Sequence, residues 1–391
     1  MAVDVVTPSA AAHRPRVEVE GLALVRRLDF VLLAATAALV VFGLWAIGGI
    51  TRHDASTPDY YVVRQGVFVA VGVVLMCAAV FVDPDVYRRS KRAIYAATIG
   101  LLVLVILAGT VARGSKRWID LSFFRFQPSE FGKLLLVLAI AGFLADRGRR
   151  INDVSTPIKA VLLACLPIVL VLAQPDIGSA LVYAAALAAL LFVAGTRWLH
   201  LGVLALAAVV GALLILWILP GAGMQVLKPY QQQRLTNFLH PNSDPQGATY
   251  HQTQAQIAVG AGGFHGRGVS GATQTNFNYL PAHATDFAFA SLAEERGFVG
   301  AAFLLMLYLL VVWRGLKIIT LARDSFSAIV AGGIVFAFLF QVFVNVGMAI
   351  GIAPITGIPL PFVSVGGSSM VANLAAIGVL QAIHARGRLR R

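Results

Sequence analysis

The sequence predicts an all-α polytopic membrane protein with about ten transmembrane helices. Of its 391 residues, 58% are apolar and only 13% are charged, whereas about a quarter of the residues in soluble domains are charged. About ten apolar segments are long enough to cross a bilayer, which takes roughly 20 residues per helix. This composition excludes an ordinary soluble enzyme, a disordered chain and a nucleic-acid-binding protein, although the net charge is +13. Cys77 and Cys165 lie inside apolar segments, which indicates neither a disulfide framework nor a metal cluster.

The predicted spans follow one another closely except at one long connection. The first apolar segment is too long for a signal-peptide core and has no small-residue cleavage site after it, so we expect it to be retained. The long connection is rich in Gln, Asn and Gly, with aromatic residues at intervals, and we expect it to be partly folded against the membrane. The spans are expected at residues 28–47, 62–82, 93–111, 129–145, 157–172, 177–194, 199–219, 286–312, 327–350 and 361–383.

The distribution of Lys and Arg orients these spans, because cytoplasmic loops carry an excess of both residues. With the N-terminus inside, most of the 31 basic residues fall in cytoplasmic segments. We therefore expect a cytoplasmic tail over residues 1–27, a ten-span membrane domain over 28–385 and a basic cytoplasmic tail over 386–391. The long extracytoplasmic loop is expected over 221–285, between spans seven and eight.

Ionisable residues near the outer ends of spans are functional candidates, since a charge in a bilayer is costly. The fourth span opens with Glu130 and Lys133, three residues apart and hence on one helix face. They are either a structural ion pair or part of a binding site. The outer loop before them carries Arg117 and Arg125, against the positive-inside trend. This loop either anchors lipid headgroups or binds a phosphate or pyrophosphate, whose oxygens match a guanidinium fork.

Two acids stand where outer helix ends are predicted. Asp176 precedes the sixth span and Asp286 opens the eighth. An acid in a first turn often does no more than complement the helix dipole. In the predicted topology, however, both acids share one side of the membrane with the basic loop and with Lys228 and Arg234. We therefore expect one cavity that holds an anionic lipid substrate.

The stretch over 357–369 contains two prolines and a Gly-Gly pair and leads into the last span. Irregular backbone at membrane depth must face protein or water, so we expect a re-entrant or broken helix that lines a cavity. Ser364 and Ser368 of this stretch are candidate substrate contacts. Asn345, in the ninth span, is expected to form a hydrogen bond across helices.

These motifs lie in five ordered segments that together resemble the SEDS family of bacterial cell-wall glycosyltransferases, which includes RodA and FtsW. The last segment is more similar to RodA. The segments are KRWIDLSFFRFQPSEFGK, QPDIGSALV, KPYQQQRLTNFLHPNSDPQGATYHQTQ, LPAHATDFAFASLAEERGFVG and NVGMAIGIAPITGIPLPFVSVGGSS.

The resemblance implies a peptidoglycan glycosyltransferase that polymerises lipid II at the outer face of the bacterial cytoplasmic membrane during cell elongation. Asp286 corresponds to the family's catalytic acid, and we expect it to act as general base. Asp176 matches an acid that lines the central cavity. The functionally sensitive positions at the start of the fourth span are matched by Arg125, Glu130 and Lys133.

Positive charge is needed for the pyrophosphate leaving group, and Arg117, Arg125 and Lys133 are the candidates. A divalent cation such as Mg²⁺ or Mn²⁺ would be held largely by the substrate phosphates, because a single Asp does not make a metal site.

The implied partners are lipid II, the undecaprenyl-pyrophosphate-linked glycan, a class B penicillin-binding protein with transpeptidase activity, and membrane proteins of the elongation complex. The alternatives are a flippase or transporter of lipid-linked precursors, an FtsW-like division polymerase and a scaffold that only recruits a transpeptidase. One-sided charge favours an enzyme, because alternating access needs groups that are reachable from both faces.

Overall fold

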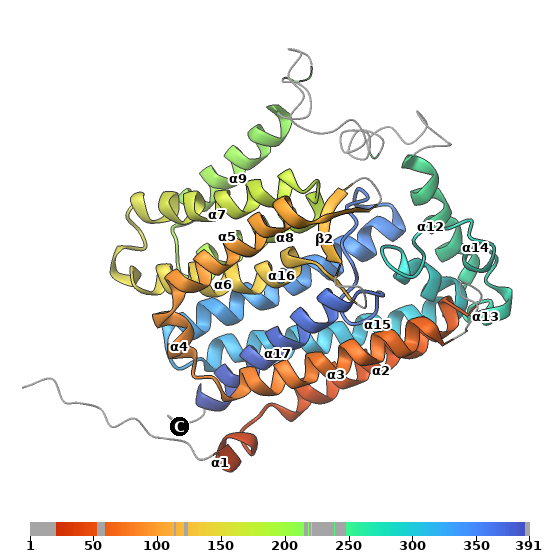
Figure 1. The fold of residues 1–391 in the computed structure, drawn as a ribbon, viewed down its shortest axis with the longest axis horizontal. Coiled ribbons are helices and arrows are strands. Elements are labelled where there is room, and N and C mark those ends of the chain that lie inside the picture. Colours follow the sequence, from red (N-terminus) through yellow and green to blue (C-terminus); the bar gives the residue numbers. More distant parts are fainter. Residues whose placement is uncertain are drawn as a thin grey trace, which may run out of the picture.

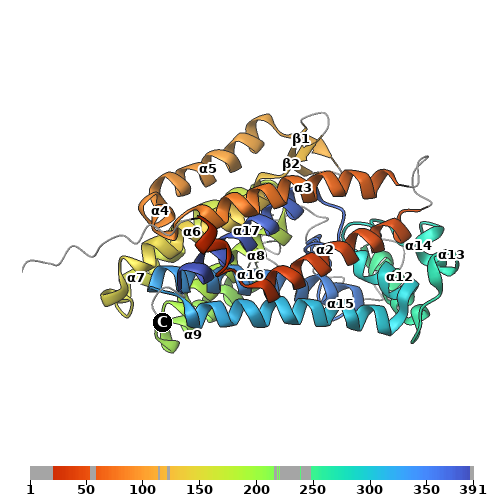
Figure 2. The same cartoon turned by 90° about the horizontal axis from the view of Figure 1, so that it is seen from below.

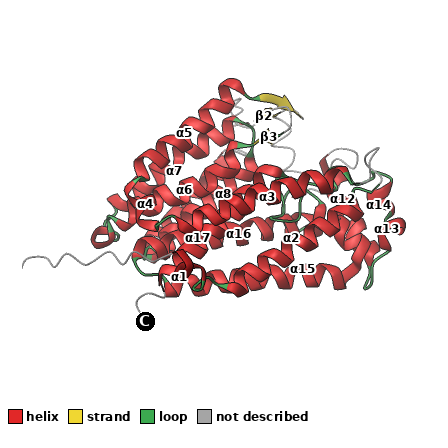
Figure 3. Cartoon of the chain, turned by 60° about the horizontal axis from the view of Figure 1, so that its bottom comes forward, coloured by secondary structure: helices red, strands yellow, loops and turns green. Residues whose placement is uncertain are grey.

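The computed structural model describes residues 21–52, 59–112, 115–120, 124–214 and 248–387, with residues 218, 220 and 238. Long helices lying roughly side by side make up almost all of the described chain (Figures 1 and 3). A small antiparallel sheet and a group of short helices lie at one end of the bundle, which we call the head. Helix α1 (Gly21–Val25) and the end of helix α17 lie at the opposite end, the foot (Figure 1). The first and last described residues thus lie at the same end of the bundle.

Ten apolar helices coincide with the ten predicted spans. Among the described residues, eight helices are long and apolar enough to cross a membrane, and two further apolar helices are shorter. The eight are α2 (Phe30–Ile50), α3 (Tyr60–Phe81), α5 (Lys91–Ala108), α6 (Pro128–Ala145), α7 (Ser155–Ala173), α15 (Ala288–Leu321), α16 (Ser325–Ile350) and α17 (Gly367–Gly387), and the shorter two are α8 (Ile177–Val193) and α9 (Trp198–Leu213). The all-α multi-span architecture is therefore confirmed, whereas the count of ten crossings stays a prediction.

A hairpin at the head shortens the third predicted span, 93–111. Helix α5 ends before Gly109, whose extended backbone turns the chain into a strand. Thr110 then pairs with Trp118, and Ile119 pairs with Phe126 on the other edge. The hairpin supplies the hydrogen bonds that the backbone beyond the helix needs. Its strands are β1 (Thr110–Ala112), β2 (Ser115–Asp120) and β3 (Arg125–Phe126).

The later part of the predicted loop over 221–285 is helical and packs against the bundle. Its helices are α12 (Ala248–Gly262), α13 (Gly268–Gly271) and α14 (Thr273–Asn276). Helix α12 lies against α15 and α16 at the head (Figure 1). Lys228 and Arg234 lie outside the described residues.

The eighth predicted span, 286–312, is a broken helix that runs from Ala288 to Leu321. The break is at Gly297, whose φ of 65° and ψ of −164° are not helical. There Phe298 N donates to Gly263 O (2.9 Å) and Val299 N donates to Phe264 O (3.2 Å). Glu294, Glu295 and Arg296 directly precede the break, but the apolar residues on both sides predict one continuous span.

A buried carboxylate on the short segment before the break anchors the head helices. Glu294 accepts hydrogen bonds from Gln274 N (2.8 Å), Thr275 N (3.0 Å) and Thr275 Oγ1 (2.8 Å). These donors belong to the first turn of α14, where a carboxylate satisfies otherwise unpaired N–H groups. Glu294 therefore fixes α14 to α15.

Helices α6, α16 and α17 form the centre of the bundle. Within their apolar windows 72%, 72% and 83% of residues are buried, against 17% in α3 and α5. Figure 2 shows α5 at the periphery, diverging from the other helices. The exposed apolar side chains of α3 and α5 suit contact with lipid.

An ion pair at the foot ties three helices together. Asp29 caps α2, and Arg314 of α15 binds its Oδ2 atom through Nε (2.9 Å) and Nη2 (2.6 Å). The Gln381 side chain of α17 exchanges hydrogen bonds of 2.8 and 2.9 Å with the Asp29 backbone. Because both buried charges are paired and hydrogen-bonded, these contacts offset the desolvation cost of burying them.

Folded structure extends into both predicted tails, 1–27 and 386–391. Leu24 of α1 is only 3% exposed and packs with Val80 and Ala385. Arg386 belongs to α17 and donates to Val80 O (3.0 Å).

Replacement of Gly297 by Ala should lower thermal stability. A Cβ atom at this position would lie 2.3 Å from Gly266 N, and the backbone conformation is one that almost only glycine adopts, with a strain of about 1–3 kcal/mol. Thermal unfolding of the detergent-purified protein measures the effect. The control is Gly260→Ala in α12, where a Cβ meets nothing within 4 Å. Equal melting temperatures for the two variants would contradict the role of the break.

Arg314→Gln should destabilise the foot by about 3–5 kcal/mol, because it leaves the buried Asp29 carboxylate without its charge partner. Arg323→Gln is the matched control, since Arg323 pairs with Asp85 and both side chains are about 40% exposed. We expect a change within about 1 kcal/mol for the control. Denaturant titration followed by intrinsic fluorescence compares the two, and similar losses would refute the assigned importance of the buried pair.

Candidate active site

Asp286 lies at the head, in the turn that leads into α15. It is partly buried and precedes the first helical residue by two positions, so it does not open the helix as the sequence pattern predicts. Its backbone oxygen accepts a hydrogen bond of 2.9 Å from Nδ2 of Asn345 on α16. The same amide donates to Ile358 O at 2.7 Å. Asn345 thus binds two loops rather than another helix, and holds the Asp286 turn against the connection between α16 and α17.

This connection, over residues 351–366, is irregular and buried in the bundle. Span ten therefore does not begin at residue 361 as predicted: α17 begins at Gly367, because Pro361 lacks an N–H and Phe362 has a positive φ of 66°. The expectation of non-helical backbone in this region is correct. At Gly357, with φ 74°, a Cβ atom would lie 3.5 Å from Asp286 Oδ2, so the carboxylate lies directly beside this glycine.

The two candidate serines, Ser364 and Ser368, form hydrogen bonds with the backbone around the site. Ser364 Oγ donates to Thr285 O and accepts from Leu360 N (2.8 Å). Ser368 Oγ accepts from Gln127 N (2.9 Å), which joins the start of α17 to the start of α6. Both side chains are buried and engaged with backbone groups.

The side-chain amide of Gln65, on α3, also contacts the connection. Its Nε2 donates to Ser364 O and its Oε1 accepts from Gly366 N, both at 3.2 Å. Tyr308 of α15 also donates a hydrogen bond to Pro361 O. The connection is therefore held by side chains from α3, α15 and α16, which satisfy backbone groups that no helix pairs.

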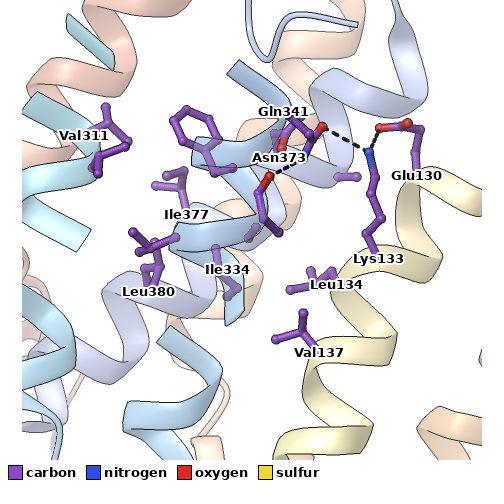
Figure 4. A pocket seen from close by; sticks show the side chains of 16 residues that line it. Glu130, Lys133, Leu134, Val137, Val311, Ile334, Gln341, Asn373, Ile377 and Leu380 are labelled. Atoms are coloured by element: carbon purple, nitrogen blue, oxygen red, sulfur yellow. Dashed lines mark hydrogen bonds and ion pairs between the residues drawn. The ribbon is translucent and has the colours of Figure 1, made fainter. Parts of the chain in front are cut away.

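Glu130 and Lys133 form an ion pair on the first turns of α6. Lys133 Nζ lies 2.7 Å from Glu130 Oε2 and donates to Gln341 Oε1 of α16 at 3.1 Å (Figure 4). Both charged side chains are less than 10% exposed. Gln341 and Asn345 are one turn apart on α16, a rise of about 6 Å. One helix thus positions Lys133 and the Asp286 turn in the same part of the head.

Asp176 caps α8 and is the centre of a second network. It accepts hydrogen bonds from Ser179 N (3.0 Å), Ser179 Oγ (2.8 Å) and Gln127 Nε2 (3.1 Å). Arg117 of β2 approaches its Oδ1 at 3.7 Å and stacks on Trp118 at 4.3 Å. The prediction that Asp176 is a carboxylate at the start of a helix is therefore correct. The same carboxylate also holds the hairpin through Arg117.

The Asp176 network adjoins the buried connection. A Cβ atom at Gly178, in the first turn of α8, would lie 2.6 Å from Thr356 O. Thr356 is the neighbour of Gly357, which lies beside the Asp286 carboxylate. The structure therefore brings the start of α8, which Asp176 caps, and the Asp286 carboxylate to neighbouring residues of one short stretch of chain.

Arg125 stands apart from these contacts. Its side chain is 61% exposed, and its Nε lies 3.6 Å from Asp120 Oδ2. Arg125 is therefore an exposed cation on the surface of the head, whereas Lys133 is a buried cation.

A small pocket lies between α6, α15, α16 and α17. Figure 4 shows Lys133, Gln341 and Asn373 at its polar end, and Val311, Ile377 and Leu380 along its apolar remainder. Its space of about 40 Å³ suits a few water molecules rather than a sugar.

Within the described part of the chain, His, Cys, Asp and Glu side chains nowhere gather in threes as a metal site would require. Glu130, Asp176 and Glu294 instead bind a basic side chain, hydroxyls and backbone N–H groups.

The amides that organise the head are not among the residues predicted from the sequence. Gln65 and Gln341 lie within apolar helices and are 1% and 3% exposed. A Gln in a span is nearly as informative as a charge, because its amide must find a partner away from water. This signal is present in the sequence at both positions.

Comparison with known proteins agrees with this architecture. A family model of cell cycle proteins, FtsW/RodA/SpoVE, matches residues 26–389. Peptidoglycan glycosyltransferase MrdB of Escherichia coli K12 is 37% identical over 367 residues, covering 92% of this chain and 96% of MrdB.

Solved structures show the same fold. A chain of the structure described as "Structural coordination of polymerization and crosslinking by a peptidoglycan synthase complex" is 32% identical with a TM-score of 0.78, covering 92% of this chain and 98% of that chain. The rod shape determining protein RodA of Thermus thermophilus is 29% identical with a TM-score of 0.67, covering 91% and 96%. The chain therefore belongs to the FtsW/RodA/SpoVE family, the SEDS family that its motifs resemble.

Proposed function

We propose that this protein is a peptidoglycan glycosyltransferase that polymerises lipid II at the outer face of the bacterial cytoplasmic membrane. The observation that carries the proposal is the placement of Asp286 and Lys133 by adjacent turns of α16, through Asn345 and Gln341. An acid and a buried cation in one region suit attack by a hydroxyl with departure of a pyrophosphate. The name of MrdB, a peptidoglycan glycosyltransferase similar over nearly its whole length, supports the same reaction.

In the proposed reaction, the growing glycan linked to undecaprenyl pyrophosphate is the donor. The 4-hydroxyl of the GlcNAc of an incoming lipid II attacks its anomeric carbon while Asp286 accepts the hydroxyl proton. A new C–O bond forms as the bond to the pyrophosphate breaks, so the configuration inverts. General-base help of this kind is worth about 10²–10⁴-fold in rate.

The leaving pyrophosphate takes two negative charges into the head. Lys133 is the buried cation, and Glu130 keeps it oriented at 2.7 Å. Arg125 is exposed enough to meet the phosphates as they arrive, and Arg117 is held in place by Asp176. We also assign substrate contacts to Lys228 and Arg234, which the predicted topology places on the same side of the membrane. Where a divalent cation takes part, the pyrophosphate oxygens would be its main ligands.

We further propose a role in cell elongation, with a class B penicillin-binding protein and elongation-complex membrane proteins as partners. The synthase complex to which the chain is similar couples polymerisation with crosslinking, which favours a transpeptidase partner. The RodA-like segment before α17 favours elongation over division.

Asp286→Asn should lower the rate of glycan formation by about 10²–10⁴-fold and leave lipid II binding intact, because the amide keeps the shape but accepts no proton. Purified protein with labelled lipid II, read out as polymer yield and length, tests this. Asp85→Asn at the foot is the control, since within the described residues the Asp85 side chain forms an exposed ion pair with Arg323 and no other. Unchanged polymer from the Asp286 variant would exclude the general-base assignment and leave precursor transport as the stronger reading.

Asn345→Leu should reduce kcat by up to about 10²-fold with little change in KM, because the Asp286 turn loses its clamp and the reacting groups shift. Gln252→Leu is the comparison, since its amide binds the same connection at Ala353 O (3.1 Å), away from Asp286. The steady-state rates of both variants are compared at equal thermal stability. Equal losses in kcat would show that Asn345 serves the fold only.

A further inference from the structure

A second cavity lies near the foot, far from the head. It is formed by the start of α5, the end of α6 and the middle of α7, and has a volume of about 470 Å³. This volume falls in the range of ligand pockets, about 300–1,000 Å³. The polar wall of the cavity contains Lys91, Arg92 and Arg147, and its floor contains Ile140 and Leu163.

The positive charge of this wall is only partly neutralised. Asp146 binds Lys91, and Arg88 at 3.0 Å. Burial favours the neutral acid, but the hydrogen bonds from Lys91 and Arg88 outweigh it and hold the pKa of Asp146 below its usual value. Arg92 and Arg147 form no ion pair with any described residue, so the cavity keeps their net positive charge.

The helix that begins at this cavity adds to the field. Helix α5 starts with Lys91 and Arg92, has no acid in its first turn, and receives no side-chain cap from Ser90. Basic residues at a helix N-terminus are disfavoured by the helix dipole. An anion there is favoured by the dipole and by the basic side chains. Asp146 supplies one anion at Lys91, and a second anion beside Arg92 would be favoured by the same dipole and by the remaining positive charge.

The other side of the cavity is apolar and faces the periphery of the bundle. Ile140 and Leu163 line it, and Arg147 stacks on Phe143 at 4.7 Å. Tyr95 closes one side by donating to Leu163 O at 2.8 Å. A free phosphate would use only the basic wall, whereas a lipid would use both the wall and the apolar floor.

We propose that this cavity binds an anionic glycerophospholipid, with its headgroup phosphate against Arg92 and Arg147 and its acyl chains along α5 and α7. The general excess of basic residues in cytoplasmic loops accounts for the number of basic residues in this region. It does not account for two arginines without an ion pair around a cavity with an apolar floor. Basic pockets between membrane helices are a recognised form of headgroup site. The site is independent of the glycosyltransferase reaction, and the bound lipid would brace the end of α6 opposite Lys133.

The test measures phospholipid binding to the purified full-length protein by native mass spectrometry and thermal unfolding. Phosphatidylglycerol should bind more tightly than phosphatidylcholine and raise the melting temperature. In the double variant Arg92→Gln/Arg147→Gln, phosphatidylglycerol should bind about 30-fold more weakly, from about 1 kcal/mol per basic residue. The Asp146 ion pairs remain intact in this variant.

The matched control is Lys159→Gln/Lys317→Gln, which removes two exposed lysines that do not line the cavity. It should bind phosphatidylglycerol as the parent does. An equal loss of affinity in both double variants would refute the proposal, because it would indicate a general charge effect.

A comparison on the unaltered protein does not depend on how the variants fold. Equal stabilisation by phosphatidylglycerol and phosphatidylcholine would refute an anion site. Equal stabilisation by inorganic phosphate would assign the cavity to a soluble ligand instead of a lipid.

Discussion

The head of this protein depends on one constraint: irregular backbone inside an apolar bundle must have its polar groups satisfied by protein. The connection over 351–366 is mostly buried and contains no continuous helix, with only an isolated turn at Leu360–Ser364. In lipid, each unsatisfied N–H or C=O costs several kcal/mol. Side chains from distant parts of the chain provide the missing partners: Gln65 from α3, Asn345 from α16 and Ser364 from the connection itself.

These same bonds place the candidate chemistry. Asn345 binds the connection and the Asp286 turn with one amide group. The Asp286 carboxylate lies beside Gly357, whose positive φ of 74° favours glycine at this turn of the connection. The stabilisation of the buried connection and the positioning of the acid are therefore one set of contacts, and a change to either affects both.

Most of the fold and part of the site could be predicted from the sequence. Apolar runs predict all ten helices, because burial in lipid leaves a strong and local signal. The pairing of Glu130 and Lys133 follows from their spacing on one helix face. The break at Gly297 could not be located, because it depends on contact with Gly266 in a segment far along the outer loop. The pair of Asp29 and Arg314 was equally hidden, since nothing local links residues 285 positions apart.

The spacing of Gln341 and Asn345 along α16 fixes the axial distance between the amide that contacts Lys133 and the amide that contacts the Asp286 turn. A helix is stiff along its axis, with a rise of 1.5 Å per residue. The axial offset of the two amides is thus set by backbone geometry, whereas the amide side chains themselves make the contacts with Lys133 and with the Asp286 turn. A substrate with a longer or shorter headgroup would therefore require a different register of α16 as well as different side chains.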